Sequence, residues 1–283
     1  MQGLRNHEVG VLFWATSDPR TMLNKASVLG VKCAQLGVAG DLDLSCTPAW
    51  VKALTEAQFP VTAVSAAYRG EDYADIPTVE RTVGFIPLGT RQEREKRTYE
   101  VADFAHAIGA EGIATHIGFV PHDKSDPNYQ AMLEMVRRVC DHAAKHELKF
   151  ALETGQESAP VLLAFLRDVN RRNLGINFDP ANMILYGTGD PIEALGVLKD
   201  HVISVHCKDG SWPPKEKPEA LGKECALGAG AVGLERFVAK LEEIGYTGPL
   251  TIEREGVEPA QWDDDVKNGI ALLERIKAHS AGA

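Results

Sequence analysis

Short apolar segments alternate with longer segments of helical periodicity from one end of the chain to the other. Several short segments, such as VGVLFW and VTAVSAAY, are apolar or small throughout, which is typical of parallel strands covered on both faces. The pattern predicts strands at residues 9–14, 31–38, 61–68, 112–119, 148–154, 174–179, 202–208 and 249–254.

The segments between these strands carry start signals of helices. A capping side chain precedes a proline whose missing N–H is harmless in a first helical turn. This arrangement occurs at Asp18-Pro19, Thr47-Pro48 and Asp190-Pro191. Each strand is therefore expected to be followed by a helix.

The alternation predicts an α/β fold, a single (β/α)₈ TIM barrel with parallel strands, in preference to an open doubly wound sheet. No Gly-x-Gly-x-x-Gly turn follows the first strand to support the open sheet. No low-complexity linker divides the chain, so we expect one domain over residues 1–283. Three long connections, 69–90, 120–128 and 210–233, would lie at the barrel mouth and cover a site there.

The charge balance narrows the range of partners. The chain has 40 acidic and 30 basic residues and a formal net charge of −10, which disfavours nucleic acid and anionic membranes. The basic run at 91–97, RQEREKR, interleaves acids, so we predict an exposed helical face there. Five cysteines without C-x-x-C spacing, no export signal and no membrane span lead us to expect a cytoplasmic protein.

Four consecutive predicted strands, the fifth to the eighth, each end in a residue able to bind a metal. These residues are Glu153 in FALETG, Asp179 in INFDPAN, His206 in SVHCKD and Glu253 in LTIERE. Strand ends converge over a barrel mouth, where three carboxylates would repel one another unless a cation lay between them. We predict one divalent metal ion, with Mn²⁺, Mg²⁺ or Co²⁺ preferred by this ligand set and Zn²⁺ also compatible.

Taken alone, each residue has a simpler explanation. A single glutamate at a strand end is usually a solvated or capping group, and a histidine in an apolar strand is usually a satisfied core residue. The metal site is favoured because the four residues occur at matching points of four successive units.

With these residues in place, the chain resembles the sugar-phosphate isomerase/epimerase group of the xylose isomerase-like barrels. That group includes ketose 3-epimerases, hydroxypyruvate isomerase, inosose dehydratase and, more distantly, endonuclease IV. The resemblance covers nearly the whole chain. Besides the four residues above, it rests on His116 in ATHIGF, the HCKDG segment, LGAGAVGLERFV and GYTGPLTIERE.

The resemblance implies that the four residues hold the metal and that Glu153 and Glu253 are catalytic. The two glutamates would stand on opposite faces of the substrate and move protons. A metal chelated by a carbonyl and an adjacent hydroxyl makes the shared carbon more acidic by stabilising an enediolate. Returning the proton to the opposite face inverts the centre, and returning it to the neighbouring carbon isomerises the sugar. We therefore expect a metal-dependent isomerase or epimerase of a sugar or keto-sugar, with a small-molecule carbohydrate as its substrate.

Some substrate-contacting positions depart from the epimerase pattern. Asn182 stands where those enzymes place a histidine, and Trp212 stands about where they carry an arginine. We expect substrate contacts from His116, Asn182, Glu157, Lys208 and Trp14. Asp209 is expected to point away from the site and act as a cap.

Other functions stay open at this point. A metal-dependent dehydratase or lyase acting on a keto-sugar or keto-inositol would use the same metal and the same carbanion. An endonuclease IV-like phosphodiesterase is disfavoured by the single aligned histidine and the negative charge. A non-catalytic sugar-binding barrel would require that no metal binds. Barrels of this kind often associate, so a homo-oligomer is also compatible with the sequence.

Overall fold

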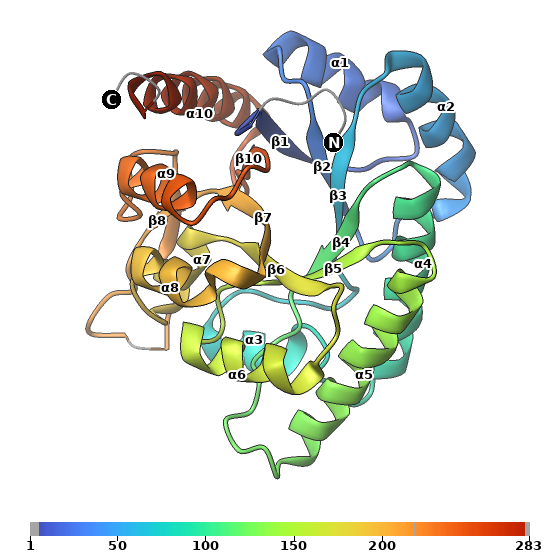
Figure 1. Ribbon diagram of the computed structural model, residues 1–283, viewed down its shortest axis with the longest axis vertical. Helices are drawn as coiled ribbons and strands as arrows, with labels where there is room; N and C mark the ends of the chain where they lie inside the picture. The colour runs from blue at the N-terminus through green and yellow to red at the C-terminus, as the bar shows by residue number, and fades with distance from the viewer. Residues whose placement is uncertain (1–5, 218, 281–283) are drawn as a thin grey trace.

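The computed structural model describes residues 6–217 and 219–280, in which eight parallel strands close into a barrel (Figure 1). The order around the barrel is β1-β10-β7-β6-β5-β4-β3-β2. The predicted (β/α)₈ barrel is therefore confirmed. The strands are β1 (Val9–Trp14), β2 (Ala34–Val38), β3 (Val61–Ala66), β4 (Gly112–Thr115), β5 (Lys149–Glu153), β6 (Leu174–Phe178), β7 (Val202–Cys207) and β10 (Leu250–Ile252).

Helices surround the strands and cover the outside of the barrel (Figure 1). They are α1 (Pro19–Leu29), α2 (Thr47–Ala57), α3 (Ile76–Thr82), α4 (Arg91–Ala107), α5 (Pro127–Ala144), α6 (Ala159–Val169), α7 (Pro180–Tyr186), α8 (Pro191–Leu198), α9 (Leu234–Glu243) and α10 (Pro259–Ser280), with 3₁₀ turns η1 (Leu44–Cys46) and η2 (Lys199–His201). None of these helices is both long enough and apolar enough to cross a bilayer.

Two of the three predicted helix caps are confirmed. Asp18 accepts a hydrogen bond from the N–H of Arg20 at the start of α1, and Asp190 caps α8 in the same way. Thr47 was predicted to cap α2 and does not, because α2 begins at Thr47 itself and its hydroxyl donates to the Leu44 carbonyl. The capping carboxylate lies earlier, at Asp43, where η1 begins and leads into α2.

The core lies in the layer between the strands and the outer helices. Phe150 of β5 and Phe178 of β6 are fully buried, as are Phe165 of α6 and Phe237 of α9. Phe178 stacks on Phe237 with ring centroids 6.0 Å apart, which joins a strand to the helix outside it. Burial of such rings stabilises the fold by roughly 1.5–3 kcal/mol each relative to exposed rings. The strands therefore have little freedom to shift in register.

The register of the later strands brings their C-terminal ends to one mouth of the barrel. Glu153 of β5 pairs with Asn177 of β6, and His206 of β7 pairs with Thr251 of β10. The positions that directly follow β6 and β10 reach the same mouth, because all the barrel strands are parallel. The predicted metal-binding residues occupy these positions.

The connection between β7 and α9 forms a small antiparallel sheet of β8 (Asp209–Ser211) and β9 (Lys223–Cys225) beside the mouth. The carboxylate of Asp209 fixes this connection, as expected for a backbone cap. It accepts hydrogen bonds from the N–H groups of Gly210, Gly228, Gly230 and Val232 at 2.9–3.1 Å. The long loop therefore has a defined conformation over the site.

The prediction of an exposed helical face at residues 91–97 is wrong for the three arginines of this segment. Arg94 is 3% exposed and donates to the carbonyls of Gly84 and Arg69. Arg91 donates to Phe85 and Ile86 in the same loop, and Arg97 donates to two carbonyls after β2. The three arginines share one face of α4 because they are spaced three residues apart. That face packs on loop backbone, whose carbonyls need donors.

We expect Arg94→Ala to lower the free energy of unfolding by about 3 kcal/mol, because two loop carbonyls lose a charged donor. Lys96→Ala is the matched control on the same helix, since the Lys96 side chain is 80% exposed. The control should change stability by less than about 0.5 kcal/mol. Urea unfolding measures both values, and equal effects of the two substitutions would show that Arg94 does not hold the loop.

Candidate metal centre

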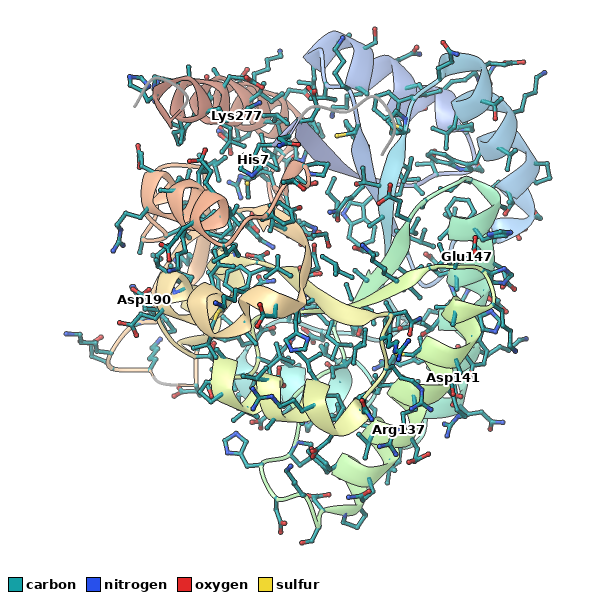
Figure 2. The ribbon with its side chains drawn as sticks, viewed as in Figure 1. His7, Arg137, Asp141, Glu147, Asp190 and Lys277 are labelled. Atoms are coloured by element: carbon teal, nitrogen blue, oxygen red, sulfur yellow. The ribbon has the colours of Figure 1, made fainter. Side chains whose placement is uncertain are left out.

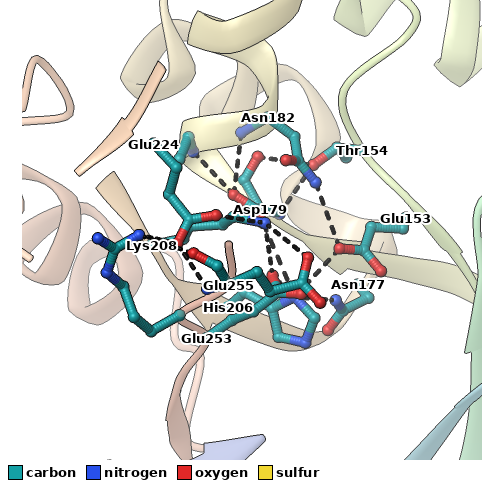
Figure 3. A network of polar contacts seen from close by, with 12 residues as sticks. Glu153, Thr154, Asn177, Asp179, Asn182, His206, Lys208, Glu224, Glu253 and Glu255 are labelled. Carbon is teal, nitrogen blue, oxygen red and sulfur yellow. Dashed lines mark hydrogen bonds and ion pairs between the residues drawn. The ribbon is translucent and has the colours of Figure 1, made fainter. Parts of the chain in front are cut away.

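Glu153, Asp179, His206 and Glu253 converge at the barrel mouth (Figure 3). All four are buried, and one ligand atom from each lies within 4.8 Å of the others. His206 Nδ1 lies 3.1 Å from Glu153 Oε1, 3.0 Å from Glu253 Oε2 and 3.8 Å from Asp179 Oδ2. The strand ends thus bring together the four side chains that the sequence singles out.

Residues on other strands orient the His206 ring. Nε2 of His206 lies 2.9 Å from Oε1 of Gln35 on β2. Because an amide oxygen only accepts, this contact makes Nε2 an N–H donor and turns Nδ1 toward the carboxylates. Asn177 also lies beside Nδ1, at 3.1 Å. Sequence reasoning missed Gln35 and Asn177, although a polar residue inside a buried strand was an available signal.

Asp179 provides a test of whether a metal fits. Its Oδ1 accepts hydrogen bonds from the N–H groups of Ala181 and Asn182 and so caps α7. Its Oδ2 is buried, and no described residue forms a hydrogen bond with it. Only longer contacts reach this oxygen, from His206 Nδ1 at 3.8 Å and Lys208 Nζ at 4.0 Å, and burial raises the pKa of Asp179 to about 6. A divalent cation would supply the missing partner, and three oxygen donors with one imidazole suit Mn²⁺, Mg²⁺ or Co²⁺.

The two glutamates of the centre are held in the ionised form. Burial opposes ionisation of Glu153, but the imidazoles of His116 and His206 outweigh it and lower the pKa of Glu153. Burial also opposes ionisation of Glu253, where Lys208 and His206 outweigh it and keep the pKa well below its ordinary value. Both carboxylates can therefore act as anionic ligands or as bases.

The buried ammonium group of Lys208 lies between several carboxylates. Its Nζ lies 3.2 Å from Glu253 Oε2, 3.4 Å from Glu224 Oε2 and 3.8 Å from Glu255 Oε2. Glu224 belongs to β9 and also pairs with Arg254 at 2.7 Å. Sequence reasoning missed Glu224, whose position depends on how the long loop after β7 folds, and Glu255, which lies two residues after Glu253. Lys208 therefore joins the metal centre to the loop that covers it.

A cavity of about 400 Å³ opens beside the centre. It contains four of the five residues expected to contact substrate, namely Trp14, His116, Asn182 and Lys208. The other lining residues are Leu12, Gly37, Ser65, Ala66, Ala67, Glu71, Tyr73, Thr115, Glu153, Leu185, Tyr186, His206, Leu221, Glu224, Glu253 and Glu255.

Contacts fix three of these four side chains near the glutamates. His116 Nε2 lies 3.7 Å from Glu153 Oε1, and Asn182 Nδ2 donates to the same oxygen at 3.3 Å. Trp14 is 47% exposed, and its indole N–H donates to Glu255 Oε1 at 3.2 Å. Gly37 leaves room for this ring, because a Cβ atom there would lie 2.8 Å from it. The cavity thus has an aromatic wall opposite polar groups.

Residues 23–276 match the family model described as Xylose isomerase-like TIM barrel. The chain belongs to this family. The match confirms the resemblance found in the sequence.

Solved structures of related barrels cover nearly all of this chain. A xylose isomerase domain protein from Planctomyces limnophilus is 42% identical with a TM-score of 0.92, and the match covers 98% of this chain and 100% of that chain. A D-allulose 3-epimerase from a Methylomonas species, in complex with D-allulose, is 20% identical with a TM-score of 0.69, covering 97% and 98%. A protein described as the probable 3-DHS dehydratase of Bacillus anthracis is 20% identical with a TM-score of 0.67, covering 94% and 98%.

A curated relative, an uncharacterised protein of Methanocaldococcus jannaschii, is 26% identical over 171 residues. The match spans 55% of this chain and 55% of that protein, so the chain covers about half the length of that relative. The structural neighbours in this family thus include sugar epimerases and a dehydratase.

Glu157 is the one expected substrate contact that does not line the cavity. Its side chain is buried, and its Oε1 accepts a hydrogen bond from the N–H of Val120 at 2.7 Å. Burial raises the pKa of Glu157 to about 8. The carboxyl group therefore holds the loop after β4. Trp212, which replaces the expected arginine, is 45% exposed and is also absent from the described lining.

Glu157 should make stability depend on pH. Its pKa in the folded chain, about 8, lies above the ordinary value of 4.5, so the folded state binds the extra proton between these values. The stabilisation is complete below about pH 4.5 and is lost as pH rises toward 8. We expect Glu157→Gln to remove this loss of stability. The free energy of unfolding of the wild type should then fall relative to that of the variant by up to about 1.4 kcal/mol per pH unit within that window.

Urea unfolding at pH 5, 7 and 9 measures this difference. Glu134→Gln on α5 is the matched control, because the Glu134 side chain is 57% exposed, and its pH profile should follow that of the wild type. Parallel profiles for Glu157→Gln and the wild type would contradict the buried neutral carboxyl.

Proposed function

We propose that this chain is a divalent-metal-dependent isomerase or epimerase of a sugar or keto-sugar. The observation that carries the proposal is that two carboxylates, Glu153 and Glu253, line the same cavity beside His206. They come from β5 and β10, which are separated in the barrel by β6 and β7. Two carboxylates that reach one cavity from separate strands are what proton transfer at two faces of one substrate requires.

Glu153, Asp179, His206 and Glu253 are the residues that would hold the metal. When bound, a divalent cation would polarise a carbonyl and an adjacent hydroxyl of the substrate and so make the C–H bond between them more acidic. The unpartnered Oδ2 of Asp179 and the mutual repulsion of three carboxylates support this assignment.

The two glutamates would exchange protons with the substrate carbon. Glu153 contacts His206 through Oε1, and Glu253 contacts it through Oε2, so each carboxylate has a second oxygen to accept a proton. Asn182 donates to Glu153 and Lys208 donates to Glu253, and these bonds fix both groups in orientation. One glutamate removes the proton and the other returns it, to the same carbon in an epimerase or to the neighbouring carbon in an isomerase.

The cavity walls favour an uncharged polyhydroxy substrate. Five glutamates line the cavity, and Lys208 is the one lysine or arginine among its described lining residues. The Lys208 ammonium group is already shared among Glu253, Glu224 and Glu255. A phosphate or carboxylate on the substrate would lie among these glutamates, whose negative charge the proposed metal ion, Lys208 and Arg254 offset only in part. Trp14 offers an aromatic face for the C–H side of a sugar.

A dehydratase is the second candidate, and the position of His116 favours it. Elimination needs a general acid beside the leaving hydroxyl, and the imidazole of His116 lines the cavity 3.7 Å from Glu153. The dehydratase among the structural neighbours supports keeping this alternative. A homo-oligomer and a cytoplasmic location stay predictions.

Metal content and proton exchange test the main proposal together. We expect Glu153→Gln and Glu253→Gln each to lower bound Mn²⁺ and to slow solvent-deuterium incorporation into a free ketose by about 10²-fold or more, because each removes a ligand and a base. Glu56→Gln, an exposed change on α2, should match the wild type. The measurements are elemental analysis and mass spectrometry of the sugar recovered from a panel of free ketoses.

Three outcomes decide between the functions. Deuterium in recovered sugar without loss of water supports an isomerase or epimerase. A dehydrated product would instead show that the chain is a dehydratase. A wild-type protein that binds no divalent metal would overturn both.

Substrate charge can be tested with a matched pair, a free ketose and its phosphate ester. We expect kcat/KM for the phosphate ester to be lower by about tenfold or more, because of repulsion in the cavity. Glu255→Gln removes one of the negative charges and should narrow the gap. Equal kcat/KM values for the free ketose and its phosphate ester in the wild type would show that the cavity glutamates do not select against charged substrates.

A further inference from the structure

The outer helices carry a second group of metal-binding side chains. Asp103 lies on α4, His142 lies on α5, and His146 follows α5 in the turn before β5. Nε2 of His142 and Nε2 of His146 lie 2.8 Å and 2.9 Å from the same oxygen, Oδ1 of Asp103. One ligand atom from each residue lies within 4.8 Å of the others. Two imidazoles and a carboxylate thus point at one place.

Aromatic neighbours hold both imidazole rings in position. Tyr99 stacks on His142 with ring centroids 4.4 Å apart and an interplanar angle of 21°. His106, one turn beyond Asp103 on α4, packs on His146 at 4.5 Å. The His142 and His146 side chains are only 21% and 27% exposed. The rings are therefore oriented before any ligand binds, which reduces the entropy lost on binding.

Asp103 differs from the two histidines in its freedom to adjust. Its side chain is 58% exposed, so its carboxylate can move without disturbing the core. Ligand atoms around a tetrahedral zinc ion are separated by about 3.3 Å, given bonds of about 2.0–2.1 Å. The present nitrogen–oxygen distances of 2.8 and 2.9 Å need to open by only about 0.5 Å to reach that spacing. Solvent at this surface would complete the coordination.

We propose that Asp103, His142 and His146 form a second cation site that binds Zn²⁺ and cross-links α4 to α5. Two imidazoles and one carboxylate suit Zn²⁺ better than Mg²⁺ or Mn²⁺, which prefer oxygen ligands. The central site has the opposite balance, with three carboxylates and one imidazole. The two sites thus differ in the metal that each ligand set prefers.

The second site lies at the other end of the barrel from the cavity. The C-terminal ends of α4 and α5 lead into β4 and β5, whereas the cavity lies where the strands end. In Figure 2, the labelled residues Asp141 and Glu147 mark the outer position of the segment that holds His142 and His146. Zn²⁺ at this position would stabilise the packing of two helices without touching the substrate.

Calorimetric titration with Zn²⁺ tests the proposal on protein kept in a large excess of free Mn²⁺, so that Zn²⁺ does not enter the central site. We expect the wild type to bind one further Zn²⁺ with a Kd of about 10 µM or tighter and to unfold at a higher temperature with Zn²⁺ present. The double variant His142→Gln/His146→Gln should lose both effects. His122→Gln, which changes an exposed loop histidine, is the matched control and should keep both.

Two further variants make the result decisive. Asp103→Asn keeps both imidazoles and should weaken Zn²⁺ binding by about tenfold or more, so it tests the site even where the double variant does not fold. Glu153→Gln should keep the outer Zn²⁺, which separates this site from the central one. The proposal is overturned if the wild type binds no further Zn²⁺, or if the histidine variant or Asp103→Asn binds it as tightly as the wild type.

Discussion

Repulsion among three buried carboxylates is the constraint on which the arrangement at the barrel mouth depends. Glu153, Asp179 and Glu253 surround the Nδ1 atom of His206, and burial opposes the ionisation of all three. His206 and Lys208 offset part of this charge, but Oδ2 of Asp179 has no hydrogen-bond partner among the described residues. Apolar residues at these strand ends would avoid that cost, so stability alone does not explain the four residues, whereas the proposed cation would.

Much of the surrounding structure serves to hold this charged group in place. Gln35 reaches from β2 across the barrel to set the orientation of His206. Glu224, carried by β9, balances Lys208 and Arg254 together. Asp209 then fixes the loop that follows β9 by accepting several backbone hydrogen bonds. The charges of the centre therefore help to hold the loop over the mouth in place. The conformation of this loop and the function of the site depend on each other.

The sequence predicts the barrel and the four converging residues for a physical reason. The alternation of side chains along a strand and the residue at which the strand ends depend on the local sequence. Closing parallel strands into a barrel then brings their matching ends together. Glu224 could not be predicted, because its position depends on how a long loop folds back. Alternating charges at residues 91–97 indicate a solvent-exposed face, but the arginines are spaced three residues apart and lie on one face of α4 that packs on loop backbone. Glu157 lies near the site in sequence, yet its carboxyl group bonds the backbone at Val120.

Asn182 is a departure from the epimerase pattern directly beside Glu153. The resemblance expects a histidine at this position, and the amide here donates to Glu153 Oε1. An amide can orient the carboxylate, but it cannot carry a proton at neutral pH. His116 lies beside the same carboxylate, with Nε2 3.7 Å from Glu153 Oε1, and its other ring nitrogen lies 3.3 Å from Nε2 of Gln156. In the proposed reaction, His116, which follows β4, would take the proton-carrying role that a histidine at position 182 would otherwise have. Under the proposed function, the choice between inversion and elimination would thus depend on whether His116 serves the carbon or a leaving hydroxyl.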